Sequence, residues 1–99
     1  MQKGGSVYIM SSPNRGSLYI GVTSGLRKRV WEHRNKVYPD GFTSRYNCVV
    51  LVYHAGFYSI EEAISEEKRL KSGSRKYKEQ LIDSVNPGWR DLWTDIEDW

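Results

Sequence analysis

Cysteine, proline and long apolar runs are all scarce in this sequence. Cys48 is the single cysteine among 99 residues, which excludes an intrachain disulfide framework and a cysteine-rich zinc site. No apolar run approaches the roughly 18 residues that span a bilayer. The residues that follow Met1 do not form the apolar stretch of a signal peptide. We therefore expect a soluble, cytoplasmic protein in a reducing compartment, with no membrane partner.

The length of the chain leaves room for one domain. A sequence of 99 residues has the usual size of a single folded unit, and its 13% of aromatic residues bring a large buried area per side chain. We predict one domain over residues 1–99, with its motifs at about 6–92 and an acidic, aromatic tail at 93–99.

Charge is distributed unevenly along the chain. The net charge is +3, yet all 15 lysines and arginines lie within residues 1–90, whereas residues 91–99 carry four acidic side chains and no basic one. A basic surface with interleaved aromatics is typical of proteins that bind a phosphate backbone, although solvated helix faces also carry such charge. The candidate nucleic-acid contacts are Arg27, Lys28, Arg34, Lys71, Arg75 and Lys78.

Three runs of β-branched and aromatic residues predict strands. Residues 6–10 and 17–22 are separated by the turn formers of residues 11–16, which predicts a β-hairpin. Residues 47–54 form a near-continuous apolar run rich in valine. Such a run favours a strand covered on both faces, most simply at the centre of the sheet.

The first predicted helix follows the hairpin. Apolar residues recur at helical spacing over residues 26–37, and either Thr23 or Ser24 can cap the first turn. Pro39 requires the helix to end before it. We expect a loop over residues 40–46.

Two further helices follow the third strand. Ser59 and Glu62 have the spacing of a capping box, and Gly73 ends the helix that they begin. Ser74 can cap the next helix, whereas the pattern of residues 89–99 does not decide between helix and loop. The fold class is therefore α+β, a small three-stranded mixed sheet flanked by helices in the order β-β-α-β-α-α.

Glu67 lies on the apolar stripe of the second helix. Ile60 and Ile64 precede it by seven and three positions, so its side chain is expected to face the core. A carboxylate there is costly unless it is paired or bound to a metal. Two interpretations are open: Glu67 is a metal ligand, or Glu66 or Glu67 lies at the edge of the stripe and pairs with Lys71 or reaches solvent.

Two pairs of side chains complete the candidate site. Arg29 and His33 are one turn apart and project from one face of the first helix. A forked, permanently charged arginine suits a phosphate, although surface charge and a half-buried histidine are the ordinary interpretation. Tyr8 and Tyr19 lie in the two hairpin strands, where they form either a supporting aromatic pair or two phenols of one site.

The order of these motifs resembles the start of the GIY-YIG nuclease superfamily. Val7-Tyr8-Ile9 precedes Leu18-Tyr19-Ile20-Gly21 by about ten residues, and Arg29 and His33 follow on a helix. The first triplet lacks the leading glycine of the family and keeps its tyrosine. Residues 63–71, 74–82 and 86–92 look like the small single-domain branch of predicted endonucleases, so the resemblance spans residues 6–92.

The resemblance implies a divalent-metal-dependent endonuclease that hydrolyses DNA phosphodiester bonds in repair, recombination or processing. The resemblance makes Tyr8 the general base. His33 is the alternative base, because a free imidazole titrates near 6.5, closer to neutral pH than a free phenol, which titrates near 10. The carried-over catalytic residues are Tyr8, Tyr19, Arg29, His33 and Glu67, with Glu67 as the ligand of one Mg²⁺ or Mn²⁺ ion and with Thr23 and Asn86 as candidate accessory residues.

Two other functions stay open. The altered first triplet also fits a non-catalytic module that binds nucleic acid. The short chain also fits a catalytic subunit that is active only beside a protein partner. The partner would supply specificity, and its candidate docking surface is Trp89, Trp93 or Trp99. DNA is the expected partner of the endonuclease.

Overall fold

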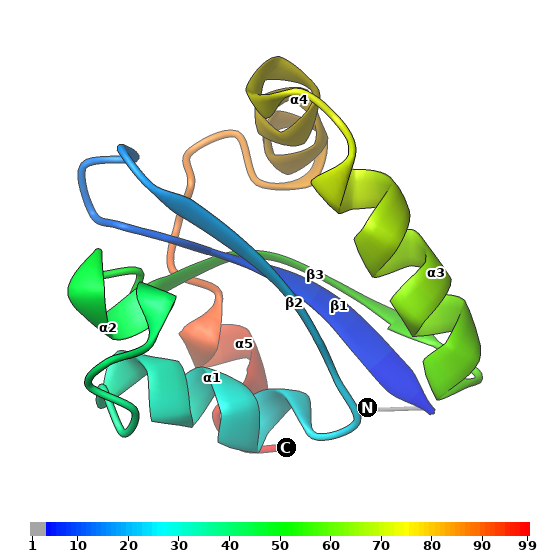
Figure 1. The fold of residues 1–99 in the computed structure, drawn as a ribbon, viewed down its shortest axis with the longest axis horizontal. Helices are drawn as coiled ribbons and strands as arrows, with labels where there is room; N and C mark the ends of the chain where they lie inside the picture. Colours follow the sequence, from blue (N-terminus) through cyan, green and yellow to red (C-terminus); the bar gives the residue numbers. More distant parts are fainter. Residues whose placement is uncertain (1–3) are drawn as a thin grey trace.

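A computed structural model describes residues 4–99, and it places a three-stranded sheet between two layers of helices (Figure 1). The predicted α+β class and the order β-β-α-β-α-α of the main elements are confirmed. The strands are β1 (Gly5–Ser11), β2 (Leu18–Thr23) and β3 (Val50–Phe57). Helices α1 (Leu26–Arg34), α2 (Phe42–Arg45) and α5 (Trp93–Ile96) lie on one side of the sheet, and α3 (Ile60–Lys71) and α4 (Arg75–Val85) on the other.

The sheet has the strand order β2-β1-β3, and β1 pairs antiparallel with both neighbours. The expectation of a mixed sheet was wrong, because both strand pairs are antiparallel. Strands β2 and β3 run in the same direction, but β1 separates them, so no parallel pair forms. The prediction that the valine-rich strand lies at the centre was also wrong, because β3 is an edge strand.

Strand β1 is central because its side chains are apolar or small on both faces. All seven of its residues are buried, and alternate residues point to opposite sides. Two core clusters result. Beneath α3 and α4 lie Val7, Ile9, Ile20, Val52, Tyr53, Ala63, Leu70 and Ile82. On the other face, with α1 and α5, lie Tyr8, Met10, Leu26, Val30, Cys48, Leu51 and Ile96.

The helix ends follow the sequence signals in α3 and α4 and depart from them in α1. Ser59 and Glu62 form the predicted capping box, and the Ser74 hydroxyl caps α4 by accepting from the backbone of Tyr77. Helix α1 instead begins after Gly25, and it ends at Arg34 because Lys36 adopts a left-handed φ of 51°. That conformation does not continue a right-handed helix.

The predicted loop at 40–46 contains a single helical turn, α2. Its turn is closed by backbone bonds from Arg45 N–H to Gly41 O, at 3.0 Å, and from Tyr46 N–H to Phe42 O, at 2.9 Å. The Cys48 N–H donates to Thr43 O at 2.8 Å and ties this turn to the start of the third strand. Helix α2 is thereby held over α1 (Figure 1).

The C-terminal segment packs against the outer edge of β3. The Leu92 N–H donates to Leu51 O at 2.8 Å, and the Asp91 carboxylate accepts from Leu51 N–H at 3.3 Å. Ile96 of α5 is fully buried in the core cluster on the α1 side. Throughout residues 4–99, every helix is too short or too polar to cross a bilayer.

Candidate active site

Tyr8 lies at the middle of the central strand and points toward α1. Its side chain is 1% exposed, and its phenol oxygen is 2.8 Å from His33 Nε2. Gly21 lies opposite Tyr8 in the register of β1 and β2. A Cβ atom at position 21 would lie 2.4 Å from the phenol oxygen, so a glycine is required where the ring rests on the backbone of β2.

His33 joins Tyr8 to α2. Its ring is 6% exposed, and Nδ1 is 2.8 Å from the Thr43 hydroxyl oxygen. Burial and the Arg29 charge lower the pKa of His33 to about 4, against a smaller opposite effect of Glu32. Burial also raises the pKa of Tyr8 well above its ordinary value, which Arg29 opposes. Both groups are therefore neutral near pH 7.

Tyr19 shares the face of the sheet that carries Tyr8. The register pairs Tyr19 with Met10 and Gly21 with Tyr8, so the two tyrosines are diagonal neighbours. The Tyr19 ring centroid lies 6.2 Å from that of Tyr8 and 5.3 Å from that of His33. The two phenols and the imidazole thus come together.

Arg29 approaches the same group from α1. Its Nη1 is 3.2 Å from Glu32 Oε1, and its guanidinium lies 5.6 Å from the Tyr38 ring centroid. A cavity of about 100 Å³ is bounded by Arg29, Tyr19 and His33, together with Glu32, Tyr38, Gly41, Phe42, Thr43 and Ser44. The structure thus brings together four of the five predicted catalytic residues, Tyr8, Tyr19, Arg29 and His33.

Glu67 belongs to α3, on the opposite face of the sheet. Its Oε2 is 2.9 Å from Lys71 Nζ, and its side chain is 14% exposed. This is the ion pair that one interpretation of the sequence predicted. Its neighbour Glu66 is held by Arg69 through two bonds, at 2.8 and 2.6 Å, and this partner keeps the pKa of Glu66 below its ordinary value.

The chemistry of a metal at this site is limited by the number of ligands. Within residues 4–99, no three His, Cys, Asp or Glu side chains gather as a set that could hold a metal ion. A Mg²⁺ ion, however, needs only one or two carboxylates when phosphate oxygens and water complete its shell. The Glu67 carboxylate on α3, whose side chain is 14% exposed, could serve as such a single protein ligand.

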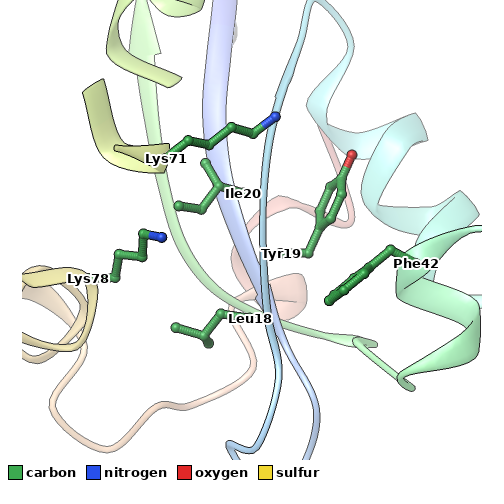
Figure 2. Close-up of a pocket in the computed structure, with 6 residues that line it drawn as sticks. All are labelled: Leu18, Tyr19, Ile20, Phe42, Lys71 and Lys78. Carbon is green, nitrogen blue, oxygen red and sulfur yellow. The ribbon is translucent and has the colours of Figure 1, made fainter. Parts of the chain in front are cut away.

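A groove runs around the edge of β2 and connects the two faces. In Figure 2, Tyr19 and Phe42 lie on one side of this strand, and Leu18, Ile20 and the two lysines lie on the other. The groove has a volume of about 280 Å³. Because Lys71 is the ion-pair partner of Glu67, the groove leads from Tyr19 to the neighbourhood of that carboxylate. Its lining residues are Leu18, Tyr19, Ile20, Phe42, Lys71 and Lys78.

The candidate nucleic-acid residues divide into two groups. Lys71 and Lys78 line the groove, and Lys28 is exposed on α1. Three arginines are engaged within the fold instead. Arg27 donates to Glu97 O at 2.7 Å, Arg34 pairs with Asp91, and Arg75 donates to Gly16 O at 3.1 Å.

The predicted docking tryptophans and accessory residues have contacts of their own. Trp93 lies against Arg27 and Arg34, with centroid distances of 5.8 and 5.2 Å. Trp89 lies 4.9 Å from the Arg15 guanidinium, and Trp99 meets His54 edge-on. The Thr23 hydroxyl accepts from Gly25 N–H at 3.0 Å. Asn86 bonds the backbones of Val52 and Arg90.

Glu32, Tyr38 and Thr43 lie at the site and were not predicted from the sequence. The spacing of Glu32, three positions after Arg29, is a signal that would have found it. Thr43 falls within the expected loop, and its place depends on His33, ten residues away in the chain. No local pattern marks Tyr38 or Thr43.

Comparisons with known proteins agree with the geometry. The family model described as the GIY-YIG catalytic domain matches residues 4–80. A UPF0213 protein of Bacillus pumilus is 37% identical to this chain, over 71% of this chain and 70% of its own length. A UPF0213 protein of Streptococcus pneumoniae is 40% identical, over 68% of this chain and 67% of its own length. A UPF0213 protein of Autographa californica nuclear polyhedrosis virus is 34% identical, over 82% of this chain and 77% of its own length. No solved structure matches significantly.

Proposed function

Because this chain belongs to the GIY-YIG catalytic domain family, which supports nuclease activity in general, we propose that it is a divalent-metal-dependent endonuclease that hydrolyses DNA phosphodiester bonds in repair, recombination or processing. The observation that carries the proposal is the convergence of Tyr8, Tyr19, Arg29 and His33 from three elements. Phosphodiester hydrolysis needs a proton acceptor and a positive group at the phosphoryl oxygens. These side chains supply both.

Arg29 is the group that we assign to the phosphate. Its guanidinium forks toward planar oxygen pairs and keeps its charge at every working pH. In the structure Glu32 holds that charge at 3.2 Å. A phosphate in the adjacent cavity competes with Glu32 for the guanidinium, and the contact strengthens as negative charge develops on the phosphoryl oxygens.

Tyr8 and His33 are the groups that we assign to the proton. Since the phenol is neutral and lies 2.8 Å from Nε2, it accepts a proton from the attacking water as its own proton passes to His33. The water oxygen keeps the electron pair that attacks phosphorus. We assign to Tyr19, whose ring centroid is 5.3 Å from that of His33, the role of orienting that water.

Glu67 is the residue that would hold the metal ion. A bound Mg²⁺ or Mn²⁺ would stabilise negative charge on the leaving oxygen and orient the phosphate. Binding requires the Glu67 carboxylate to exchange its contact with Lys71, which then becomes available to a phosphate along the groove. Glu66 is less suited because Arg69 already takes both of its oxygens.

Cleavage by matched tyrosine variants tests the proton assignment. Purified protein should cut at least one of linear, nicked, flap, branched and single-stranded DNA in Mg²⁺ or Mn²⁺, and should stop in EDTA. Tyr8→Phe should lower kcat by about 10²–10⁴-fold, the usual contribution of general acid–base catalysis. Tyr53→Phe is the control, because Tyr53 is a buried tyrosine in the opposite core cluster.

A second pair of variants tests the metal assignment. Glu67→Gln should raise the Mg²⁺ concentration needed for half-maximal cleavage and lower the maximal rate, whereas Glu66→Gln should leave both unchanged. Equal behaviour of the two variants would contradict the role of Glu67. A metal-independent gel shift without cleavage on any DNA would favour the non-catalytic binding module, and cleavage that appears only with an added protein would favour the partner-dependent subunit.

A further inference from the structure

Thr43 closes a buried hydrogen-bonded chain that begins at Tyr8. The Tyr8 phenol oxygen is 2.8 Å from His33 Nε2, and His33 Nδ1 is 2.8 Å from the Thr43 hydroxyl oxygen. The three side chains are between 1% and 6% exposed. They come from β1, α1 and α2, so the chain connects three elements of the fold.

The protons of this chain can be arranged in two ways. A neutral imidazole carries one proton, on Nδ1 or on Nε2. With the proton on Nε2, His33 donates to the Tyr8 oxygen, and the phenol proton needs a different acceptor. With the proton on Nδ1, His33 donates to Thr43, and its Nε2 lone pair accepts the phenol proton.

The surroundings of Tyr8 favour the second arrangement. Besides His33, a charged group that acts on the phenol is Arg29, which opposes the rise in the Tyr8 pKa that burial causes. A guanidinium only donates, so Arg29 cannot receive the phenol proton. Among the residues that the structure describes, His33 offers the phenol proton an acceptor, through Nε2 at 2.8 Å from the phenol oxygen. A buried hydroxyl without an acceptor is costly. Tyr8 is 1% exposed and does not line the cavity beside Arg29, whereas Thr43 lines it, so solvent there can accept the Thr43 hydroxyl proton.

We propose that Thr43 is a positioning residue, whose hydroxyl accepts the Nδ1 proton of His33 and so holds the imidazole in the tautomer that turns the Nε2 lone pair toward Tyr8. The catalytic consequence rests on the proposed function. In the cleavage step the water proton goes to the Tyr8 oxygen and the phenol proton goes to Nε2. Thr43 then accepts from the same Nδ1–H of the imidazolium, as a group that orients a catalytic histidine does.

The charged and titratable groups around His33 are consistent with this role. Tyr8 faces it from β1, Tyr19 from β2, and Arg29 and Glu32 from α1. Burial and Arg29 disfavour the imidazolium in the resting protein. The tautomer of the neutral ring is therefore the state to measure.

Nitrogen-15 NMR of the imidazoles in the full chain measures that tautomer directly. The chain has two histidines, and a His54→Gln variant assigns the signals of His33. Wild type and Thr43→Ser, which keeps the hydroxyl, should show a protonated Nδ1 and an unprotonated Nε2. Thr43→Val has the same shape without the hydroxyl, and it should raise the fraction of rings protonated on Nε2, because Nδ1–H then lacks its acceptor while Tyr8 still favours the Nδ1 tautomer. Thr94→Val, in an exposed threonine, is the control and should change nothing.

Two NMR results would overturn the proposal. One is a wild-type ring that carries its proton on Nε2. The other is a Thr43→Val ring whose two tautomers have the same fractions as in wild type. A circular dichroism melt of each variant verifies that the ring is observed in folded protein, and Thr43→Ala provides a second variant without the hydroxyl if Thr43→Val does not fold.

Kinetics separate this proposal from the proposed function. Thr43→Val should lower kcat by about 10–100-fold, as the loss of an outer hydrogen bond to a functional histidine does, with KM unchanged and with recovery in Thr43→Ser. A rate loss without a change of tautomer would overturn the positioning role. Protein that shows the Nδ1 tautomer and cleaves nothing would support the assignment of Thr43 and overturn the nuclease function.

Discussion

The two faces of the sheet are built from the same strands, and both bury apolar side chains, but the α1 face also buries a linked polar group. Beneath α3 and α4 the buried set is almost entirely aliphatic, with Leu70 and Ile82 fully enclosed. On the α1 face the buried set includes the linked polar groups of Tyr8, His33 and Thr43. Alternation along β1 produces both faces from consecutive residues.

This difference separates stability from chemistry. Aliphatic packing lowers the free energy of the folded state without requiring partners for polar atoms. A buried phenol and imidazole require hydrogen bonds to each other or to neighbours, and these bonds orient them. From the α3 side, Lys71 reaches the groove at the edge of β2 (Figure 2), and Glu67 is its ion-pair partner.

The largest expected effect comes from the aliphatic face. Leu70→Ala should lower the free energy of unfolding by about 2–5 kcal/mol, because it removes a fully buried side chain and leaves a cavity. Urea denaturation measures the change, and Val85→Ala, at a side chain that is 63% exposed, is the control. The cleavage rate per folded molecule should stay the same. A rate loss as large as that of Tyr8→Phe would break the separation.

The polar face should make stability depend on pH. The pKa of His33 is about 4 in the folded protein against an ordinary value of 6.5. Between these values the unfolded chain holds a proton that the folded chain does not, so the free energy of unfolding should fall as the pH drops from about 6.5 to about 4, by at most about 3 kcal/mol. Denaturation at a series of pH values measures this slope.

His33→Gln is the variant that isolates this effect. Burial lowers the pKa of His54 as well, so the wild-type slope contains contributions from both histidines. In His33→Gln the free energy of unfolding should depend on pH less steeply than in wild type, because the contribution of His33 is gone and that of His54 remains. A pH dependence parallel to that of wild type would show that His33 does not change its protonation between the two states.

The contact of Tyr8 with the backbone of β2 gives an effect of intermediate size. Gly21→Ala places a Cβ 2.4 Å from the phenol oxygen and should lower the free energy of unfolding by about 1–3 kcal/mol, with cleavage reduced because the ring must move from His33. Gly56→Ala, where the added Cβ meets nothing within 4 Å, should change stability by less than about 0.5 kcal/mol. Equal effects would contradict the close approach.

The smallest expected effect on stability is at the rim. Lys71→Met removes an ion pair of a side chain that is 53% exposed, which contributes about 0.2–1 kcal/mol at most. Its effect on DNA should be clearer, because loss of one phosphate contact lowers the slope of log affinity against log salt by about 1. Lys68→Met, exposed on the same helix, should keep the wild-type slope. Titrations at several salt concentrations provide the comparison.

Local patterns predicted much of the fold, whereas the resemblance to the GIY-YIG family, carried by the order of the motifs, selected the residues of the candidate site. The hairpin that carries Tyr8 and Tyr19 and the capping box of Ser59 depend on neighbouring residues, and short-range spacing records them. The position of β3 depends on which strand pairs with β1, and an apolar run does not contain that information. Thr43 was missed because its role arises only when a turn of α2 packs on His33.

The edges of the sheet have a consequence for self-association. An exposed strand edge can pair with another chain and begin aggregation. The C-terminal segment occupies part of the edge of β3 through its bonds to Leu51. At the edge of β2 the groove carries Lys71 and Lys78, and like charges discourage two copies from joining there. The same two lysines that we assign to a phosphate backbone therefore also disfavour edge-to-edge pairing of two copies at β2.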